Sequence, residues 1–420
     1  MSDSRCKVWT GAKRALIFAL ALFAALNLFI KPVSAFDIKE IRGEKLPKPF
    51  KPVQVEQTEP PVQRSDLCAD ELECMASAKA AVLIEASSGQ MLLKKEPDLR
   101  LPMASTTKTM TALVTIENCS LDDVVVVSKQ VVGVEGSSLY LTLGERLTVR
   151  DLLYGLMLSS GNDAAVALAI HVGGSVEGFA DMMNERAAKL GLENTHFVTP
   201  NGLHDDEHYT SAYDLAVIGA AALKYDVFHE IVSCKYYKLI TDRRTVTIKN
   251  KNTMLWDYEG CIGIKTGYTK RAGRCLLFAA ERDGMTLVGV VLKCSPMFEV
   301  APEMLDFGFE NYMLVRAVNS GMELSRGFVQ NGDKSFIPLV AKEDVAVPMR
   351  KGDELKAEIR TNISGAVYAP IVKGAVLGEA EILIGGCVVG KTELVAGDSV
   401  FIRAFPAYFK YLIRLFSGGH

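Results

Sequence analysis

The chain has 420 residues, 49% of them hydrophobic and 23% charged, which excludes a mainly disordered protein and leaves room for two domains at about 150 residues each. The formal net charge of -3 gives no overall basic field, so the composition argues against a nucleic-acid-binding protein. Neither Cys-x-x-Cys nor His-Glu-x-x-His occurs, so no structural or zincin-type zinc site is expected.

The N-terminus has the three-part layout of a secretory signal peptide. A basic segment (residues 5–14) precedes an uncharged apolar run (15–30), and Val33-Ser34-Ala35 offers the small-x-small pattern of a signal-peptidase site. Cleavage is expected after Ala35, which makes residues 1–35 the signal. The alternative is an uncleaved anchor, although about 16 apolar residues fall just short of the roughly 17–25 that span a bilayer. In either case the rest of the chain is expected to be exported.

Export affects the interpretation of the nine cysteines. Without Cys6 of the signal, eight remain, an even number that permits disulfides but does not require them in a chain of this size. Cys68 and Cys74 are close enough in sequence to close a small loop. The sequence leaves every other pairing open.

Residues 36–78 are polar and punctuated by prolines, and they are predicted to form an extended tether. Hydrophobic periodicity then predicts an α/β domain over residues 79–315. Its expected strands are 80–85, 90–93, 244–249, 274–280 and 285–292. Its expected helices are 103–118, 149–158, 163–171, 176–190 and 211–223.

Residues 316–398 are predicted to form a smaller all-β domain. Their short apolar runs are separated by turn signals at Asn331-Gly332, Lys351-Gly352-Asp353 and Gly385-Gly386. The stretch Gly385 to Thr392 also matches the phosphate-binding loop pattern Gly-x4-Gly-Lys-Thr. That loop requires a helix after it, and the following residues are too few and too rich in turns to form one. A β-hairpin is therefore expected at Gly385-Gly386.

Residues 399–420 are predicted to form an amphipathic helix on a membrane surface. At about 100° per residue, a cationic side lies opposite an aromatic one, and the segment after Pro406 is too short to span a bilayer. The alternative is a terminal helix packed on the protein core. The aromatic side holds Phe401, Phe405, Tyr408, Phe409, Leu412 and Phe416, and the polar side holds Arg403, Lys410, Arg414 and Ser417.

Ser105-Thr106-Thr107-Lys108 opens the first predicted helix and is the first motif with a clear chemical meaning. A spacing of three residues puts the Ser105 hydroxyl and the Lys108 amine on one helical face. A neutral Lys108 could take the proton of Ser105 if burial or nearby cations lower its pKa. Ser105 is expected in the first helical turn, near unpaired backbone N–H groups and the positive end of the helix dipole. Alone, the motif is weak, because a serine there can simply cap a helix.

Two further motifs follow in order. Ser160-Gly161-Asn162 lies at a break between two predicted helices; its serine can relay a proton and its Asn162 amide can hold a peptide group. Lys265-Thr266-Gly267 offers a cation and a hydroxyl for a carboxylate, and its glycine lets a ligand approach the strand backbone. Ser-x-x-Lys, Ser-Asp-Asn and Lys-Thr-Gly in this order are the signature of β-lactamases and penicillin-binding proteins, and all three motifs are present here except that Gly161 takes the place of the aspartate.

The stretches around these motifs resemble the low-molecular-mass penicillin-binding proteins, the D-alanyl-D-alanine carboxypeptidases of the S11 peptidase type. The similar segments are residues 101–108, 159–169, 197–203 with His208-Tyr209, and 263–270. Gly161 replaces the aspartate of Ser-Asp-Asn, as is usual in these carboxypeptidases, which favours them over class A β-lactamases. The resemblance covers residues 79–313. It implies an α/β (α+β) catalytic domain with an antiparallel sheet flanked by helices, followed by a small all-β domain and the amphipathic tail.

The resemblance implies a serine acyl-transfer cycle on peptidoglycan stem peptides. Ser105 would attack the carbonyl of the penultimate D-alanine with Lys108 as general base, and Ser160 would relay a proton to the leaving D-alanine. Water would then hydrolyse the acyl-enzyme. β-Lactams would acylate Ser105 by the same route. The scheme needs no metal or cofactor, and it implies a site of action on the extracytoplasmic face of the bacterial cytoplasmic membrane.

By the same resemblance, substrate binding would use Asn162, Lys265, Thr266, Gly267 and Tyr268. The backbone N–H groups of Ser105 and Tyr268 would hold the oxyanion. Asn162 would orient the acyl chain. Lys265 and Thr266 would hold the terminal carboxylate, with Gly267 giving access to the strand.

Several alternatives remain open from the sequence. A β-lactamase or a D,D-endopeptidase would use the same three motifs, and a catalytically idle wall-binding protein would depend on the β domain alone. A fast β-lactamase also needs a base for deacylation, and no residue is identified for that role. His204 and His208, with acidic residues between them, could suggest a metal loop, but their setting favours a polar loop near the active cleft.

Overall fold

The computed structural model describes residues 71–352, 356–363, 365–384 and 386–402. The predicted signal peptide, most of the predicted tether and the amphipathic tail from residue 403 lie outside the described residues. An α/β part extends to the end of α9 (Met297–Asn311), and an all-β part begins directly after it at Tyr312. None of the described helices is both long and apolar enough to cross a membrane.

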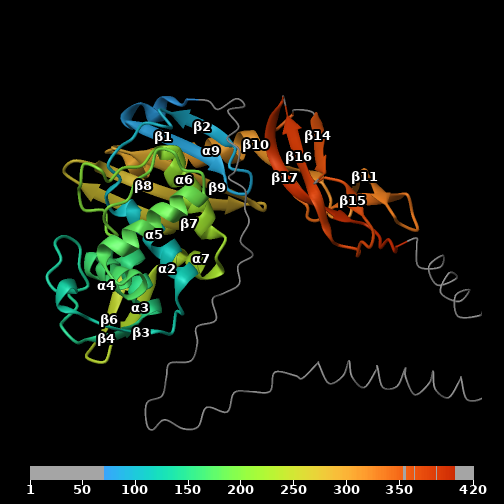
Figure 1. The fold of residues 1–420 in the computed structure, drawn as a ribbon. Helices are drawn as coiled ribbons and strands as arrows, with labels where there is room; N and C mark the ends of the chain where they lie inside the picture. The colour runs from blue at the N-terminus through green and yellow to red at the C-terminus, as the bar shows by residue number, and fades with distance from the viewer. Residues whose placement is uncertain (1–70, 353–355, 364, 385, 403–420) are drawn as a thin grey trace, which may run out of the picture. The chain divides into compact units, whose positions relative to one another are not determined.

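The α/β part is built on a five-stranded antiparallel sheet with the order β2-β1-β9-β8-β7 (Figure 1). The first two strands come from the beginning of this part and the other three from its end, so one sheet joins segments that are far apart in sequence. The strands are β1 (Ala80–Glu85), β2 (Met91–Lys95), β7 (Cys261–Thr269), β8 (Gly273–Arg282) and β9 (Met285–Leu292).

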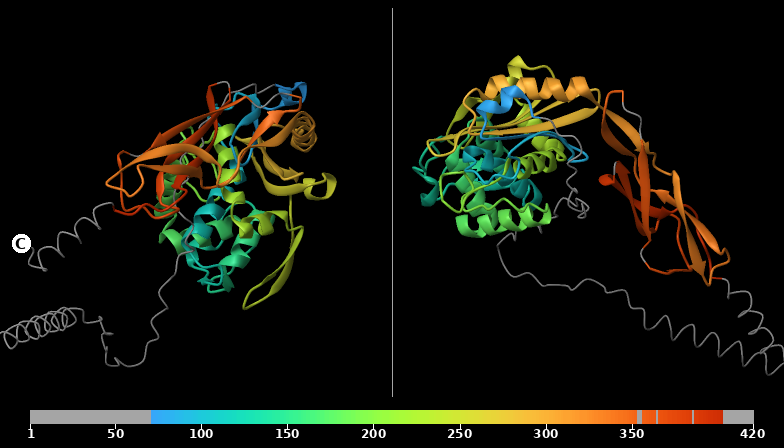
Figure 2. Two further views of the ribbon diagram at one scale, coloured as in Figure 1. Left: turned by 90° about the vertical axis from the view of Figure 1, so that its right-hand side faces the viewer. Right: turned by 90° about the horizontal axis from the view of Figure 1, so that it is seen from above.

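Alternate residues of β1 face two different hydrophobic cores. Val82 and Ile84 belong to the core shared with α2 (Lys108–Asn118), α3 (Val149–Leu158), α4 (Asn162–Gly173) and α6 (Ala212–Leu223). Ala81 and Leu83 belong to the core shared with α9 and η1 (Glu73–Ser77). Because successive strand residues point to opposite faces, both faces are apolar, and helices cover both of them (Figure 2).

The other elements surround this framework. They are η2 (Ala104–Thr107), β3 (Val124–Val126), η3 (Lys129–Val131), β4 (Arg146–Thr148), α5 (Val176–Lys189), α7 (Asp226–Ser233), β5 (Tyr236–Ile240), β6 (Thr245–Lys249) and α8 (Met254–Asp257). Strands β3 and β4 form one antiparallel pair, and β5 and β6 form another. The predicted strands, and the predicted helices after the first, are confirmed to within two residues at each end. The expected elements did not include helices α7, α8 and α9 or strands β3, β4, β5 and β7.

The first predicted helix is partly wrong. Its first turn is the 3-10 turn η2, and the α-helix α2 begins only at Lys108. Ala104 has a φ of 50°, which an α-helix does not accept. The hydroxyls of Thr106 and Thr107 donate to the carbonyl oxygens of Met103 and Ala104, at 2.6 and 2.8 Å, and hold the tighter turn. Ser105 therefore lies in a 3-10 turn before the helix.

The C-terminal part is all-β, as predicted. Strands β10 (Tyr312–Val318) and β13 (Val345–Arg350) pair with each other, and six strands form a sheet with the order β14-β16-β17-β12-β11-β15. All pairs in that sheet are antiparallel except β11 with β15. The six strands are β11 (Glu323–Gln330), β12 (Phe336–Ala341), β14 (Ala357–Ile363), β15 (Val367–Tyr368), β16 (Val376–Ile384) and β17 (Cys387–Ala396).

The phosphate-loop match lies in a β-hairpin, as expected. Ile384 of β16 pairs with Cys387 of β17, and Lys391 and Thr392 lie within β17. A strand rather than a helix therefore follows the glycines, and the helix N-terminus that would bind a phosphate is not formed there. This arrangement excludes the nucleotide-binding interpretation of the motif.

The cysteines with described side chains are free thiols: Cys74, Cys119, Cys234, Cys261, Cys275 and Cys294. Cys68, the suggested partner of Cys74, lies outside the described residues. The small loop that these two cysteines could close therefore stays a prediction.

Candidate active site

Ser105 and Lys108 form the centre of the candidate site. The Lys108 Nζ lies 2.9 Å from the Ser105 Oγ. Lys108 begins α2 and is completely buried, while Ser105 is half-buried in η2. The predicted nucleophile and base are therefore within direct proton-transfer distance.

Two further acceptors hold the amine of Lys108. Its Nζ lies 2.7 Å from the Asn162 Oδ1 and 2.6 Å from the backbone oxygen of Asn201. A neutral amine has two N–H groups and one lone pair. Because neither acceptor can donate, these oxygens take the two N–H groups, and the lone pair is left for the hydroxyl proton of Ser105.

The surroundings of Lys108 favour this neutral form. Burial is the main cause that lowers the pKa of Lys108 well below its ordinary value, and the positive charges of Lys265 and Lys251 lower it further. Asp163 acts in the opposite direction. A buried lysine surrounded by cations can act as a base near neutral pH, which an exposed lysine cannot.

The second motif lies where α3 ends and α4 begins. Ser160 is buried and has a φ of 61°, and Asn162 is the first residue of α4. The Asn162 Nδ2 donates to the carbonyl oxygen of Glu135 at 2.5 Å, and its backbone N–H donates to Ser137 at 2.7 Å. This leaves one Nδ2 hydrogen of Asn162 for a ligand. Among the described residues, Ser160 is not a partner of the Lys108 Nζ.

The carboxylate of Asp163 fixes the loop in front of Asn162. It accepts from the Ser138 hydroxyl at 2.6 Å and from the backbone N–H groups of Leu139 and Leu141, at 2.9 and 3.1 Å. One buried side chain therefore orders residues 138–141, next to the loop residues that bind Asn162.

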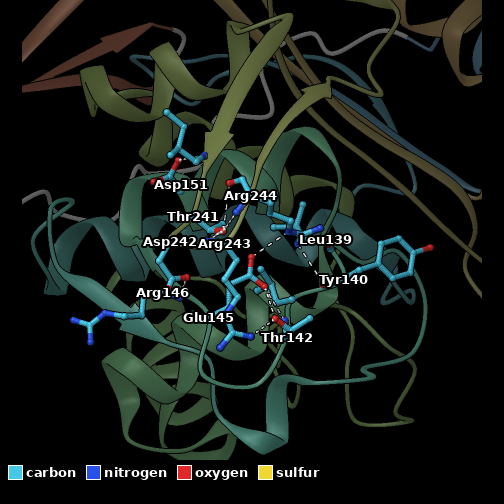
Figure 3. Close-up of polar contacts among 12 residues, drawn as sticks. Leu139, Tyr140, Thr142, Glu145, Arg146, Asp151, Thr241, Asp242, Arg243 and Arg244 are labelled. Atoms are coloured by element: carbon cyan, nitrogen blue, oxygen red, sulfur yellow. Dashed lines mark hydrogen bonds and ion pairs between the residues drawn. The ribbon is translucent and has the colours of Figure 1, made fainter.

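A second buried carboxylate ties the same loop to the turn between β5 and β6 (Figure 3). Glu145 is fully buried; its Oε2 accepts from the N–H and the hydroxyl of Thr142, both at 2.9 Å, and its Oε1 accepts from the Arg244 Nε at 3.1 Å. Arg244 also donates to the carbonyl oxygen of Leu139 at 2.7 Å. These bonds lower the pKa of Glu145 although its burial opposes them. The ion pair therefore joins the loop at Leu139 and Thr142 to Arg244.

The third motif lies on β7, the edge strand of the five-stranded sheet, beside η2. Lys265 is buried, and burial, with the charge of Lys251, lowers its pKa to about 7. A Cβ on Gly267 would lie 3.0 Å from the backbone nitrogen of Ser105, so a side chain there would clash with η2, the turn that contains Ser105. Thr266 is half-buried and Tyr268 is 66% exposed.

The structure adds residues that the sequence did not single out. Lys251, between Asn250 and Asn252, donates from its Nζ to the Ser137 Oγ at 3.1 Å and lowers the pKa of both motif lysines. Asn201 accepts from Lys108 through its backbone oxygen. Any residue has such an oxygen, so the residue type at position 201 does not indicate this contact. Of the predicted site residues, Ser105 and Asn162 contact the Lys108 amine directly. Lys265 acts on Lys108 through its charge, which lowers the Lys108 pKa.

The histidines do not form the metal loop that was considered as an alternative. His208 is buried; its Nε2 lies 2.8 Å from the Thr107 Oγ1, and its Nδ1 accepts from the backbone N–H of Val198 at 3.0 Å. His204 instead lies 3.3 Å from the exposed carboxylate of Asp206. His208 thus stabilises η2, the turn that contains Ser105, through its hydrogen bond with Thr107.

In the described part of the chain, one other group could hold a metal ion. The ligand atoms of Cys119, Asp123 and His171 lie within 4.8 Å of one another. The Cys119 thiol donates to the Thr115 oxygen at 3.2 Å, and the His171 Nε2 lies 3.8 Å from the Asp123 Oδ2. None of them is a partner of the three motifs.

Comparisons with known proteins agree with this geometry. The peptidase S11 family model, described as D-alanyl-D-alanine carboxypeptidase, matches residues 68–295, and the model of the penicillin-binding protein 5 C-terminal domain matches residues 312–401. The chain is 34% identical to D-alanyl-D-alanine carboxypeptidase DacF of Bacillus subtilis over 80% of this chain and 90% of that one. It is 39% identical to the D-alanyl-D-alanine carboxypeptidase of Streptomyces sp. K15 over 53% of this chain and 84% of the relative. The crystal structure of penicillin-binding protein 5 from Haemophilus influenzae matches with a TM-score of 0.65 and 31% identity, over 77% of this chain and 98% of that one.

Proposed function

The chain belongs to the peptidase S11 family of D-alanyl-D-alanine carboxypeptidases, and on that premise we propose that it removes the terminal D-alanine from peptidoglycan stem pentapeptides through an acyl-enzyme on Ser105. The observation that carries this proposal is the 2.9 Å contact between the Ser105 Oγ and a fully buried Lys108 amine whose pKa is lowered. A serine that only caps a helix would not need a fully buried lysine amine beside it.

In the first half of the cycle, the Ser105 Oγ attacks the carbonyl carbon of the penultimate D-alanine, and its proton passes to the Lys108 Nζ. The negative charge that develops on the carbonyl oxygen is held by the backbone N–H groups of Ser105 and Tyr268. The C–N bond then breaks, and the proton passes through Ser160 to the departing amine of D-alanine. The products are free D-alanine and an ester on Ser105.

In the second half, water attacks the ester carbonyl and returns Ser105 to its free form. Lys108 again takes the proton of the nucleophile and returns it to the Ser105 oxygen as the ester bond breaks. No metal or cofactor takes part in these steps. β-Lactams enter by the same attack, and covalent binding of β-lactams is typical of this family.

Substrate binding uses the remaining motif residues. The spare Nδ2 hydrogen of Asn162 donates to a carbonyl oxygen of the acyl chain. Lys265, with Thr266, binds the terminal carboxylate, and Gly267 keeps β7 close to η2, the turn that contains Ser105. The cations Lys251 and Lys265 make this pocket electropositive, which suits a peptide that ends in a carboxylate.

The proposal includes the cellular location. The predicted signal at residues 1–35 directs export, the tether at 36–78 precedes the catalytic domain (79–315), and the β domain (316–398) leads to the amphipathic segment 399–420 at the membrane surface. The enzyme would then act on the extracytoplasmic face of the cytoplasmic membrane. The supporting observation is the sequence pattern of both ends.

The test is D-alanine release from a synthetic stem pentapeptide by the chain from Phe36 onward, with Ser105→Ala as the control. Release by the native chain alone supports a D,D-carboxypeptidase with Ser105 as nucleophile. No release by a folded chain that a β-lactam still acylates would point to a β-lactamase or an endopeptidase, and no acylation at all would point to an idle wall-binding protein.

A further inference from the structure

Four large aromatic side chains gather, largely exposed, at one end of the C-terminal six-stranded sheet. Phe328 and Phe336 are each 59% exposed, Tyr368 is 56% exposed and Phe401 is 67% exposed. We call these four residues the aromatic end. Soluble domains expose single apolar residues routinely, but a cluster of this kind marks an interaction surface.

Strand register brings the four together. Phe328 of β11 pairs with Phe336 of β12, and their rings meet edge to face with centroids 5.5 Å apart. On the other side of β11, Gln330 pairs with Tyr368 of β15. The backbone N–H of Asp333, in the turn after β11, donates to the Phe401 oxygen at 2.8 Å. The aromatic end therefore surrounds the turn between β11 and β12, near the β15 edge of the sheet. Figure 1 shows β11 and β15 side by side there.

The core of the domain does not need these rings. Val329, Val367 and Ile337, their neighbours in sequence, are buried in the core of this sheet. Because strand residues alternate between faces, Phe328, Phe336 and Tyr368 occupy outward positions, where an antiparallel sheet facing water normally carries polar residues. Three outward aromatic residues on adjacent strands thus require an explanation other than packing.

The chain itself indicates what covers this surface. Ile402 forms a bridge with Gly332 in the same turn, so the described part of the chain ends at the aromatic end. The sequence of that segment predicts an interfacial helix with aromatic residues on one side and Arg403, Lys410 and Arg414 on the other. Aromatic rings favour the boundary between headgroups and acyl chains, and cations favour anionic lipid.

We propose that the aromatic end lies in the interface of an anionic phospholipid membrane, as a second contact beside the amphipathic tail. The inference rests on the exported location and the tail contact proposed above. One weak interfacial contact gives only reversible membrane binding. When two contacts are linked in one chain, binding of the first holds the second close to the bilayer, so the overall affinity for the membrane is higher. The β domain would then be held at the bilayer by its own end and not only by the segment that follows it.

Tryptophan fluorescence tests this directly, because the chain has only Trp9 and Trp256. In full-length protein carrying Trp9→Phe and Trp256→Phe, single probes are introduced as Phe328→Trp at the aromatic end and Phe409→Trp in the tail. The matched control is Ile359→Trp, an exposed position on β14 at the opposite edge of the same sheet. The protein is reconstituted with phosphatidylglycerol–phosphatidylethanolamine vesicles, with and without brominated acyl chains.

We expect brominated lipid to quench the probe at 328 about twofold and to leave the probe at 359 unchanged, since an interfacial face lies roughly 5–10 Å into the headgroup boundary. Quenching at 409 without quenching at 328 would overturn the inference and leave the tail contact standing. Emission at 328 that is already blue-shifted without vesicles and insensitive to brominated lipid would also overturn it, because the tail or a second copy then covers the surface.

A second variant removes the rings. Phe328→Ser combined with Phe336→Ser and Tyr368→Ser should weaken vesicle binding at least about tenfold, given the apolar area that each ring buries. Ile359→Ser is the control and should leave binding unchanged. Acylation of the triple variant by a fluorescent penicillin should remain unchanged, which shows that its α/β part is folded and active. Loss of vesicle binding with normal acylation is therefore a loss of the membrane contact and not of the proposed enzyme activity. Equal vesicle binding by the triple variant and the native protein would overturn the inference.

Discussion

Replacing His208 with glutamine is expected to remove a pH-dependent part of the stability of the α/β part. His208 is only 3% exposed, and its Nδ1 accepts backbone N–H groups from Val198 and Thr199, at 3.0 and 3.4 Å. The ring must therefore carry its proton on Nε2, which donates to the Thr107 Oγ1 at 2.8 Å. The Thr107 hydroxyl in turn donates to Ala104, the residue before Ser105.

The size of the effect follows from the pKa. Burial, as the main cause, lowers the pKa of His208 from 6.5 to about 4; His196, His204 and Lys108 lower it further, and Asp205 opposes them. Between these two pKa values the unfolded chain binds a proton that the folded chain does not, so stability falls as the pH falls. A shift of this size corresponds to about 3 kcal/mol, fully present above pH 6.5 and lost by pH 4.

The assay is urea unfolding of the chain from Phe36 onward, followed by the fluorescence of Trp256, at pH values from 8 to 4. Glutamine does not titrate, so the free energy of unfolding of His208→Gln should fall by about 3 kcal/mol less than that of the native chain over this range. His229→Gln, at an exposed position on α7, should keep the native pH dependence. An identical pH dependence in His208→Gln and the native chain would refute the reasoning.

Three further changes test other parts of the site. Ser105→Ala should abolish labelling by a fluorescent β-lactam without a change in circular dichroism. Labelling that persists in a folded variant would show that Ser105 is not the nucleophile. Lys251→Met removes a charge that lowers the pKa of Lys108, the proposed general base, so the acid limb of the acylation rate should move to higher pH. Lys249→Met is the control, and an equal shift in both variants would contradict the proposed role of Lys251. Glu145→Gln should lower the free energy of unfolding by about 1–3 kcal/mol, because the fully buried side chain at 145 then loses a hydrogen bond to Thr142 or to Arg244. Glu393→Gln, in a half-exposed ion pair, should cost less than about 1 kcal/mol, and equal thermal shifts in the two would count against the brace.

Local sequence signals predicted the elements well, because their causes are local. The alternation in β1 and the periodicity of α3 arise from burial against one core, and both predictions are confirmed. The first predicted helix failed at η2, where a positive φ at Ala104 and two threonine hydroxyls stabilise a tighter turn. Alanine has no special preference for that conformation, so the residue type gave no warning.

The site could be predicted only where its residues form short motifs. Ser105 and Lys108 are three positions apart, so their proximity follows from the chain itself. Lys251 joins the site through long-range packing, and nothing in its immediate sequence indicates it. Asn201 and His208 lie in stretches that resemble the family, and the loop of His208 was expected near the cleft, but their bonds to Lys108 and Thr107 depend on the fold. The carboxylates that brace the loop, Asp163 and Glu145, have ordinary surface residue types but are buried, which only the fold reveals.

The electrostatics of the site connect substrate binding to pH. Burial and the charge of Lys251 lower the pKa of Lys265 to about 7, so Lys265 is charged below pH 7 and increasingly neutral above it. If Lys265 binds the terminal carboxylate, the KM for a stem pentapeptide should rise as the pH increases through 7, whereas kcat should not follow the same curve. A pentapeptide with an amidated C-terminus has no carboxylate to lose, so it should bind weakly with no such rise. Parallel pH profiles of KM for the two peptides would show that Lys265 does not recognise the carboxylate.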